Sequence, residues 1–182
     1  MNRMLAGLLL AALVVLAAAY AASPLFAFQQ LKQAAHDGDK DRLEALVDFP
    51  AVRDSMKQQV EGRVVKLAQK ADGIGLPGTV LGKLGSIFGD RAVDKAVTPE
   101  AISAMVQLGE TPRQHKKRLK EAGEDAKDAP PQGVVTHYAY LTPDRFRVGV
   151  ASAAAPDAEI ALLLDRRGLF GWRVEAIELP GR

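Results

Sequence analysis

The chain has 182 residues, of which 24 are Lys or Arg and 22 are Asp or Glu, so its net charge is only +2. Nucleic-acid binding is not expected, because it usually depends on a strongly basic surface. Cysteine is absent, which excludes disulfide bonds, thiolate metal sites and a cysteine nucleophile. The apolar fraction of 48% and the charged fraction of 25% are typical of a single globular domain.

The segment 1–22 has the composition of a membrane segment. An uncharged run from Met4 to Ala22 follows Arg3, and as a helix it would reach about 28 Å, close to the thickness of the hydrocarbon core of a bilayer. With Arg3 on the cytoplasmic side, the positive-inside rule places residues 23–182 outside the cytoplasm. We therefore expect a single-pass membrane protein with its domain on the extracytoplasmic side.

Two interpretations of this segment remain open. An uncleaved anchor is favoured by the length of the run, by the helix-compatible sequence beyond Pro24, and by Tyr20, an aromatic residue of the kind found at membrane interfaces. A signal peptide is favoured by the small residues of Ala19-Tyr20-Ala21, which would allow cleavage after Ala21. A buried helix of a water-soluble protein fits less well, since soluble cores seldom need such a long run at the extreme N-terminus.

Residues 23–109 predict the helical half of one domain. Ser23 and Pro24 are typical of an N-cap followed by the first residue of a helix. Gly38 would end that helix, and Asp39 would cap a short second one.

A third helix is expected from Ala51 to Lys70, because apolar residues recur there at helical spacing. Basic residues border this apolar stripe, so the helix could lie on anionic lipid, although such helices more often cover a core. The glycine-rich residues 73–89 suggest a loop that leads into a short helix. Thr98-Pro99-Glu100 indicates another helix start with Thr98 as its N-cap, and Gly109 would end this helix.

Residues 110–133 carry mixed charges and predict a solvated helix or a linker. Residues 134–182 predict the β-sheet half of the same domain, because apolar and polar side chains alternate in most of its strands and 160–164 is a continuous apolar run typical of a central strand. We expect strands at 134–141, 145–151 and 160–164, and a fourth strand that returns from Trp172 to Leu179. Short connections favour a four-stranded antiparallel meander, and helices followed by strands favour an α+β fold.

Several short motifs of the chain are distinctive. They are Ala22-Ser23-Pro24, Gly38-Asp39, Val47-Asp48-Phe49-Pro50-Ala51-Val52-Arg53, Val97-Thr98-Pro99-Glu100, Arg167-Gly168-Leu169, Trp172-Arg173 and Leu179-Pro180. Together, over nearly the whole chain, they resemble a bacterial family known only as domain of unknown function 2939. The resemblance implies a membrane-directed bacterial protein, located in the inner membrane, or in the periplasm if the N-terminal segment is cleaved. It brings no known activity and no catalytic residue.

The order of the elements is also similar to that of cone-shaped folds related to nuclear transport factor 2. In such folds, helices and a curved antiparallel sheet often enclose an apolar pocket. This similarity implies an apolar pocket, but a shared fold does not determine a function.

No catalytic residue, cofactor site or metal site is predicted. Residues 73–78 have the letters of a dinucleotide fingerprint, but a helix precedes them and Pro77 removes one of the backbone amides that would bind pyrophosphate. The three histidines are His36, His115 and His137, and none has a second histidine nearby. The basic residues 113–118 are better explained as a solvated helix face, since acidic residues follow them.

Asp48, Phe49, Arg53 and Trp172 are the candidate site residues. The Asp48 carboxylate is placed to accept hydrogen bonds from backbone amides at the start of the third helix, and Phe49 would hold the turn in the core. The four residues are expected to form either a structural lock or the mouth of a pocket.

These features predict a non-enzymatic, extracytoplasmic binding or interaction module of the cell envelope. Its expected partners are membrane lipid and either a lipid-like ligand or another envelope protein, with no cofactor and no nucleic acid. Two other functions remain open. One is an enzyme whose site is assembled only in three dimensions, for instance around Asp48 and His137. The other is a scaffold that binds another membrane protein through the basic helix or the charged tract.

Overall fold

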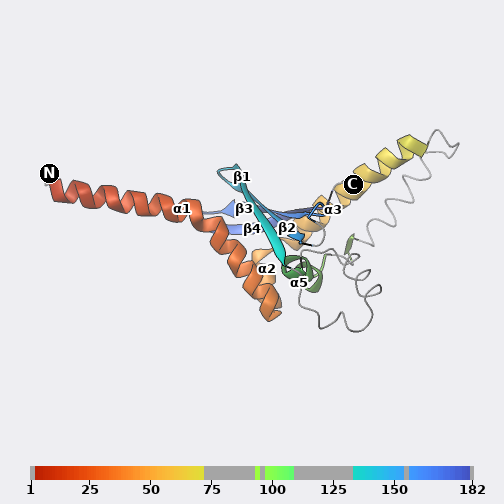
Figure 1. The fold of residues 1–182 in the computed structure, drawn as a ribbon, viewed down its shortest axis with the longest axis horizontal. Helices are drawn as coiled ribbons and strands as arrows, with labels where there is room; N and C mark the ends of the chain where they lie inside the picture. Colours follow the sequence, from red (N-terminus) through yellow and green to blue (C-terminus); the bar gives the residue numbers. More distant parts are fainter. Residues whose placement is uncertain (1–2, 72–92, 95–96, 109–132, 154–155, 181–182) are drawn as a thin grey trace.

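The computed structural model describes residues 3–71, 93–94, 97–108, 133–153 and 156–180. Helices form the first part of the chain and a four-stranded antiparallel sheet forms the second, so the predicted α+β class is confirmed (Figure 1). The glycine-rich segment 73–89 lies outside the described residues, and so does the charged tract 110–133 except for its last residue.

Helix α1 (Arg3–Asp37) is a single helix that continues through Pro24. The prediction that Ser23 caps a new helix is therefore wrong, and α1 crosses the expected boundary at residue 22. Proline has no N–H, so Pro24 cannot donate to the carbonyl of Tyr20 four residues earlier. The Ser23 hydroxyl donates to that carbonyl instead, at 2.7 Å, which helps the helix to continue. The helix bends along its length, as proline-containing helices do (Figure 1).

Helix α2 (Lys40–Leu46) follows α1 after a sharp turn. Gly38 has a φ of 67° there, a left-handed conformation that glycine adopts more easily than other residues. The Asp39 carboxylate accepts a hydrogen bond from the backbone N–H of Arg42 at 3.0 Å, so the predicted N-cap is confirmed. The turn directs α2 back along the side of α1.

Two further helices, α3 and α5, follow in the described part of the chain. Helix α3 (Phe49–Ala71) starts two residues before the predicted Ala51 and ends one residue after the predicted Lys70. Helix α5 (Pro99–Leu108) starts as predicted, with the backbone N–H of Ala101 donating to the hydroxyl of Thr98 at 3.2 Å.

The sheet consists of β1 (Val134–Thr142), β2 (Arg145–Ser152), β3 (Ile160–Arg167) and β4 (Gly171–Glu178). Their spatial order follows the chain, and each pairs antiparallel with the next, so the predicted meander is confirmed. This order places the β1–β2 and β3–β4 turns at one end of the sheet and the β2–β3 turn at the other.

The core lies between the helices and one face of the sheet. Large buried side chains come from both halves of the chain, and they include Phe28, Leu31, Leu43, Val52, Met56, Ile102, Phe146, Val148, Ile160, Leu162, Leu164 and Ile177. A cone-shaped fold would leave an apolar pocket at this position. In the described part of the chain, helical side chains pack on that face of the sheet instead.

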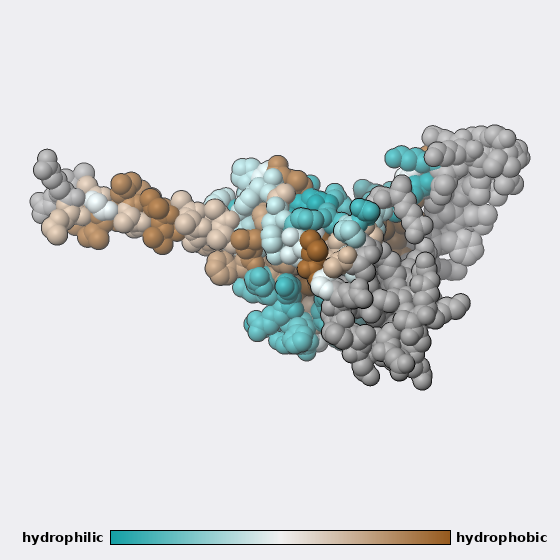
Figure 2. All heavy atoms as spheres, viewed as in Figure 1, coloured by the Kyte–Doolittle hydropathy of each residue, from teal (hydrophilic) through white to brown (hydrophobic). Residues whose placement is uncertain are grey.

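The N-terminal half of α1 lies outside this core. Residues 4–19 are exposed, and Figure 2 shows their apolar surface projecting from a largely hydrophilic domain. Among the described residues, α1 is the one helix that is long and apolar enough to cross a membrane, judged by length and composition. A signal sequence has the same length and composition, so these two properties do not distinguish a cleaved signal peptide from an uncleaved anchor.

Candidate functional site

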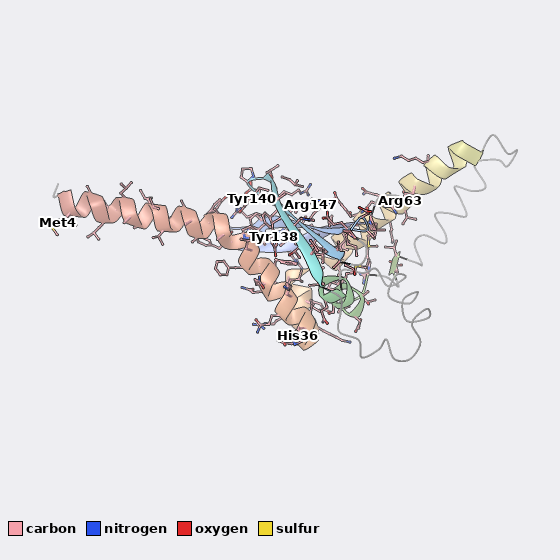
Figure 3. All side chains as sticks on the ribbon, in the orientation of Figure 1. Met4, His36, Arg63, Tyr138, Tyr140 and Arg147 are labelled. Atoms are coloured by element: carbon pink, nitrogen blue, oxygen red, sulfur yellow. The ribbon has the colours of Figure 1, made fainter. Side chains whose placement is uncertain are left out.

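The sheet is joined to α1 at the place where the exposed apolar part of the helix ends. The indole N–H of Trp172 donates to the hydroxyl of Ser23 at 2.8 Å. The hydroxyl of Tyr140 donates to the carbonyl of Ala21 at 2.7 Å. Figure 3 shows Tyr140 on β1, beside the bend of α1. Two strands therefore bind the turn of the helix that directly precedes Pro24, and we call this set of contacts the helix–sheet junction.

Arg166 is at the centre of the helix–sheet junction. Its guanidinium carbon lies 3.7 Å from the ring centroid of Tyr20 and 4.2 Å from that of Trp172, which gives two cation–π contacts. The same guanidinium donates to the carbonyls of Leu169 at 2.7 Å and Pro143 at 2.9 Å. Only 5% of the Arg166 side chain is exposed. Arg166 therefore links both hairpin turns to α1.

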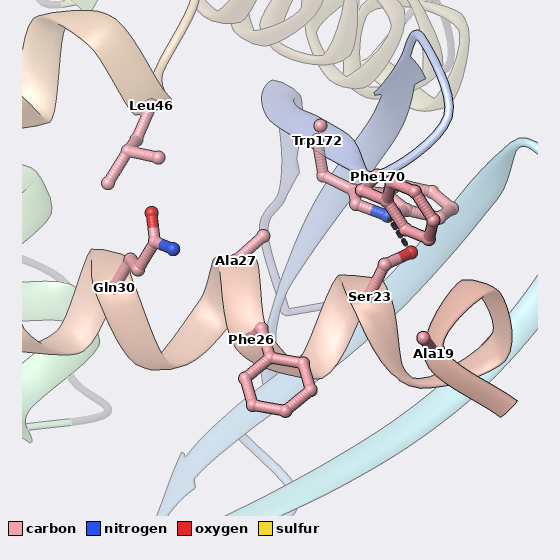
Figure 4. Close-up of a pocket in the computed structure, with 9 residues that line it drawn as sticks. Ala19, Ser23, Phe26, Ala27, Gln30, Leu46, Phe170 and Trp172 are labelled. Carbon is pink, nitrogen blue, oxygen red and sulfur yellow. Dashed lines mark hydrogen bonds between the residues drawn. The ribbon is translucent and has the colours of Figure 1, made fainter. Parts of the chain in front are cut away.

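A hollow of about 360 Å³ lies beside the helix–sheet junction, between α1, α2 and the β3–β4 turn (Figure 4). Its lining residues are Ala19, Ser23, Phe26, Ala27, Gln30, Leu46, Phe170, Gly171 and Trp172. None of them is titratable in the physiological range, so this lining has no general acid or base. The Ser23 hydroxyl already donates to Tyr20 and accepts from Trp172. The hollow is suited to binding an apolar group.

Asp48, Phe49 and Arg53 form a separate group at the start of α3. The Asp48 carboxylate accepts from the backbone N–H of Ala51 at 3.2 Å and lies 3.5 Å from the guanidinium of Arg173. Phe49 is buried. Arg53 donates to the carbonyl of Val97 at 3.1 Å, which connects α3 to the start of α5. Of the four candidate residues, Trp172 lines the hollow and the other three do not.

The chain around Asp48 also covers the outer edge of β4. Val47 forms a parallel bridge with Val174, and the backbone N–H of Asp48 donates to the carbonyl of Val174 at 2.8 Å. Arg173 donates to the carbonyl of Glu44 at 3.0 Å. An uncovered strand edge can pair with other chains. The Asp48-Phe49-Pro50 segment therefore lies at the edge of the sheet and helps to cover it.

Substitution of Asp48 by alanine is expected to lower the free energy of unfolding by about 1–2 kcal/mol, because it removes the N-cap of α3 and the partner of Arg173. Asp48→Asn should retain most of this stability, since its amide oxygen can still cap the helix. Urea unfolding of the intact protein in detergent, followed by circular dichroism, measures both effects. A loss as large in Asp48→Asn as in Asp48→Ala would contradict the capping role.

His137 lies on the sheet face opposite the core, far from Asp48. Its Nδ1 is 2.7 Å from Glu159 Oε2, and Arg147 is 2.6 Å from the other oxygen of that carboxylate. Glu159 lies over Gly149, where a side chain would collide with the carboxylate. Asp48 is at the β4 edge and His137 is on β1 at the other edge. The structure therefore does not bring Asp48 and His137 together in one site.

The pKa of Glu159 is lowered, mainly by the hydrogen bond with His137; burial raises it, and Arg147 lowers it further. A carboxylate with a lowered pKa stabilises the folded state above its unfolded pKa of about 4.3. This contribution is lost as the pH falls through the lowered pKa. We expect Glu159→Gln to reduce the free energy of unfolding at pH 7 by up to about 1 kcal/mol. The difference from the wild type should disappear in acid, and urea unfolding across the pH range would measure it. A difference that persists in acid would contradict this prediction.

Other sequence features give no site in the described residues. No group of three His, Cys, Asp or Glu side chains is arranged to hold a metal ion within the described ranges. His36 is at the exposed end of α1. Residues 73–78, His115 and the basic residues 113–118 lie outside the part of the chain that the structure describes.

The geometry defines an α+β protein whose first helix is long and apolar enough to be a signal or transmembrane helix and is bound by the sheet that follows it. A family model described as "Protein of unknown function (DUF2939)" matches residues 13–105. The chain belongs to this family, which confirms the resemblance found in its motifs. No curated protein and no solved structure matches the chain.

The family match covers the helical side of the helix–sheet junction. Residues 13–105 include Tyr20, Ser23 and the Asp48–Arg53 segment, but they end before the sheet begins. The resemblance of the motifs between Arg167 and Pro180 is therefore not tested by this match.

Sequence reasoning did not identify Ser23, Tyr140 and Arg166 as parts of the site. One available signal was Pro24 after a long helical run, because a proline inside a helix leaves a carbonyl that needs another donor. Tyr140 and Arg166 had no comparable signal, since each is one of several similar residues on the strands.

Proposed function

We propose that this protein is an uncleaved, single-pass protein of the bacterial envelope, whose extracytoplasmic domain is a non-enzymatic binding or interaction module. The observation that carries the proposal is the helix–sheet junction, in which Tyr20, Ala21 and Ser23 are all bound by the sheet. These residues follow directly on the exposed apolar part of α1. The anchor and the domain thus share one set of hydrogen bonds and ring contacts.

Cleavage after Ala21, the alternative, would remove part of the helix–sheet junction. Arg166 would lose the ring of Tyr20 and Tyr140 would lose the carbonyl of Ala21, because both residues leave with the signal peptide. A signal peptide is discarded and need not contribute to the mature fold. Contacts on both sides of the cleavage point therefore favour retention of α1. The extracytoplasmic side is supported by Arg3 through the positive-inside rule.

The hollow beside the helix–sheet junction supports a binding role. Phe26, Leu46 and Phe170 give it an apolar lining, and its Ser23 hydroxyl is used in holding α1. Small-molecule sites are usually apolar with few polar groups. This lining suits an acyl chain or an apolar side chain of another envelope protein better than a reacting polar substrate.

Membrane attachment and sidedness can be tested together because the chain has no cysteine. A single cysteine replaces Asp157, which is exposed in the β2–β3 turn, and a matched control replaces Asn2. We expect the protein to stay in carbonate-washed membranes. An impermeant maleimide should label Asp157→Cys when only the outer membrane is permeable, and Asn2→Cys only after the inner membrane is opened. Release by carbonate, or the reverse labelling pattern, would contradict the proposal.

A further inference from the structure

Exposed apolar side chains gather at one end of the sheet. Leu169, in the β3–β4 turn, is 70% exposed, and the neighbouring Phe170 is also exposed. Leu141 is exposed at the β1–β2 turn. The pairing of Arg145 with Asp165 brings the start of β2 beside the end of β3, so these two turns are neighbours. Soluble surfaces rarely concentrate large apolar side chains at hairpin turns unless something contacts them.

This end of the sheet meets α1 where the exposed apolar part of the helix ends. Arg166, next to the β3–β4 turn, stacks on Tyr20. Phe170 lines the same hollow as Ala19 and Phe26, and Phe26 is 65% exposed on α1 (Figure 4). The apolar surface of the helix therefore continues onto the hairpin turns.

The charges at this end are paired with one another. Arg145 binds Asp165 through both carboxylate oxygens, at 2.6 and 2.7 Å. Arg166 lies 3.2 Å from Asp144, and Arg167 is paired with Glu175. Basic clusters attract anionic lipid when their charge is in excess. Here each arginine faces a carboxylate, so contact with a membrane would depend on the apolar side chains.

We propose that the β1–β2 and β3–β4 turns dip into the bilayer that holds α1, with Leu169 and Phe170 in contact with lipid. The contact is apolar and does not require anionic lipid. This inference rests on the proposed function, because it takes α1 as the membrane anchor. It adds that the domain lies against the membrane surface, with the Pro24 bend and the helix–sheet junction setting its orientation.

Nitroxide labels on single cysteines test the inference in the intact protein. Leu169→Cys is the test position, and Leu141→Cys is a second test on the other turn. Leu9→Cys, in the exposed apolar part of α1, reports the anchor, and Asp157→Cys, at the far end of the sheet, is the water-exposed control. The labelled protein is placed in vesicles of phosphatidylcholine alone or with phosphatidylglycerol. Collision of the label with oxygen is compared with collision with a water-soluble nickel chelate.

In both kinds of vesicle, we expect labels at Leu9, Leu141 and Leu169 to collide more often with oxygen, which dissolves in lipid. The label at Asp157 should collide more often with the nickel chelate, which stays in water. Lipid contact at Leu9 with water contact at both Leu141 and Leu169 would overturn the inference and leave the proposed anchor standing. Water contact at Leu9 would overturn the anchor itself. Lipid contact at the turns only in vesicles with phosphatidylglycerol would overturn the claim that the contact is apolar.

Discussion

Replacement of Trp172 by alanine is expected to lower the free energy of unfolding by about 4 kcal/mol, a large part of the stability of a small domain. Trp172 is buried against α1, donates to Ser23 and stacks on Arg166. Its removal leaves a cavity and takes away the hydrogen-bond donor to the Ser23 hydroxyl. Urea unfolding of the intact protein in detergent, followed by far-ultraviolet circular dichroism, would measure the loss.

Two variants separate the contributions of Trp172. Trp172→Phe keeps much of the ring and loses the N–H, so we expect a smaller loss of about 1–2 kcal/mol. Phe170→Ala removes an aromatic side chain from the same hairpin, but Phe170 is exposed, and we expect a change below about 1 kcal/mol in detergent. Similar losses in Trp172→Ala and Phe170→Ala would contradict the role assigned to the helix–sheet junction.

Substitution of Arg166 by leucine is expected to cost about 3 kcal/mol. The substitution removes two cation–π contacts and leaves the carbonyls of Pro143 and Leu169 without their donors. Arg166→Lys should recover little, because an ammonium group cannot stack between two rings and donate to separate carbonyls in the same way. Trp172 is the one tryptophan of the chain, so its fluorescence reports the unfolding of this region directly.

Arg167 provides a matched control for Arg166. It is the next residue in the chain, but its side chain is 61% exposed and paired with Glu175 on the surface. Exposed ion pairs contribute up to about 1 kcal/mol, so we expect little effect of Arg167→Leu. Full recovery of stability in Arg166→Lys, or equal losses in Arg166→Leu and Arg167→Leu, would contradict the arrangement described for Arg166.

Much of the fold was predictable because it depends on local rules. Asp39 and Thr98 cap their helices through backbone amides three residues away, and such patterns are visible in the sequence. Strand positions followed from alternation of side chains and, for the third strand, from a continuous apolar run, and the short connections favoured a meander. These features need no knowledge of distant residues.

The prediction at Ser23 failed for a physical reason. Ser-Pro fits the start of a helix, but it also fits a helix interior if another donor serves the carbonyl that proline leaves. Here the Ser23 hydroxyl is that donor, and Trp172, 149 residues away in the sequence, holds the hydroxyl in place. A contact of that separation cannot be read from spacing.

The candidate site was predicted only in part. The interaction of the Asp48 carboxylate with the start of α3 follows from local capping. The environment of Arg166 was not predictable, because its partners come from α1, both hairpin turns and β4. The pocket implied by the cone-shaped folds was not found between the sheet and helices, where side chains fill the described interior. The hollow that is present lies instead beside the helix–sheet junction.

The mass of the protein extracted from its own membrane tests most directly whether α1 remains part of the molecule. If the helix–sheet junction joins anchor and domain permanently, the recovered chain retains Tyr20 and Ala21 and is found in the membrane fraction. A mature chain that begins at Ala22 and is recovered from the soluble periplasmic fraction would contradict this result. In that case the contacts of Arg166 with Tyr20 and of Tyr140 with Ala21 would have no role in the mature protein.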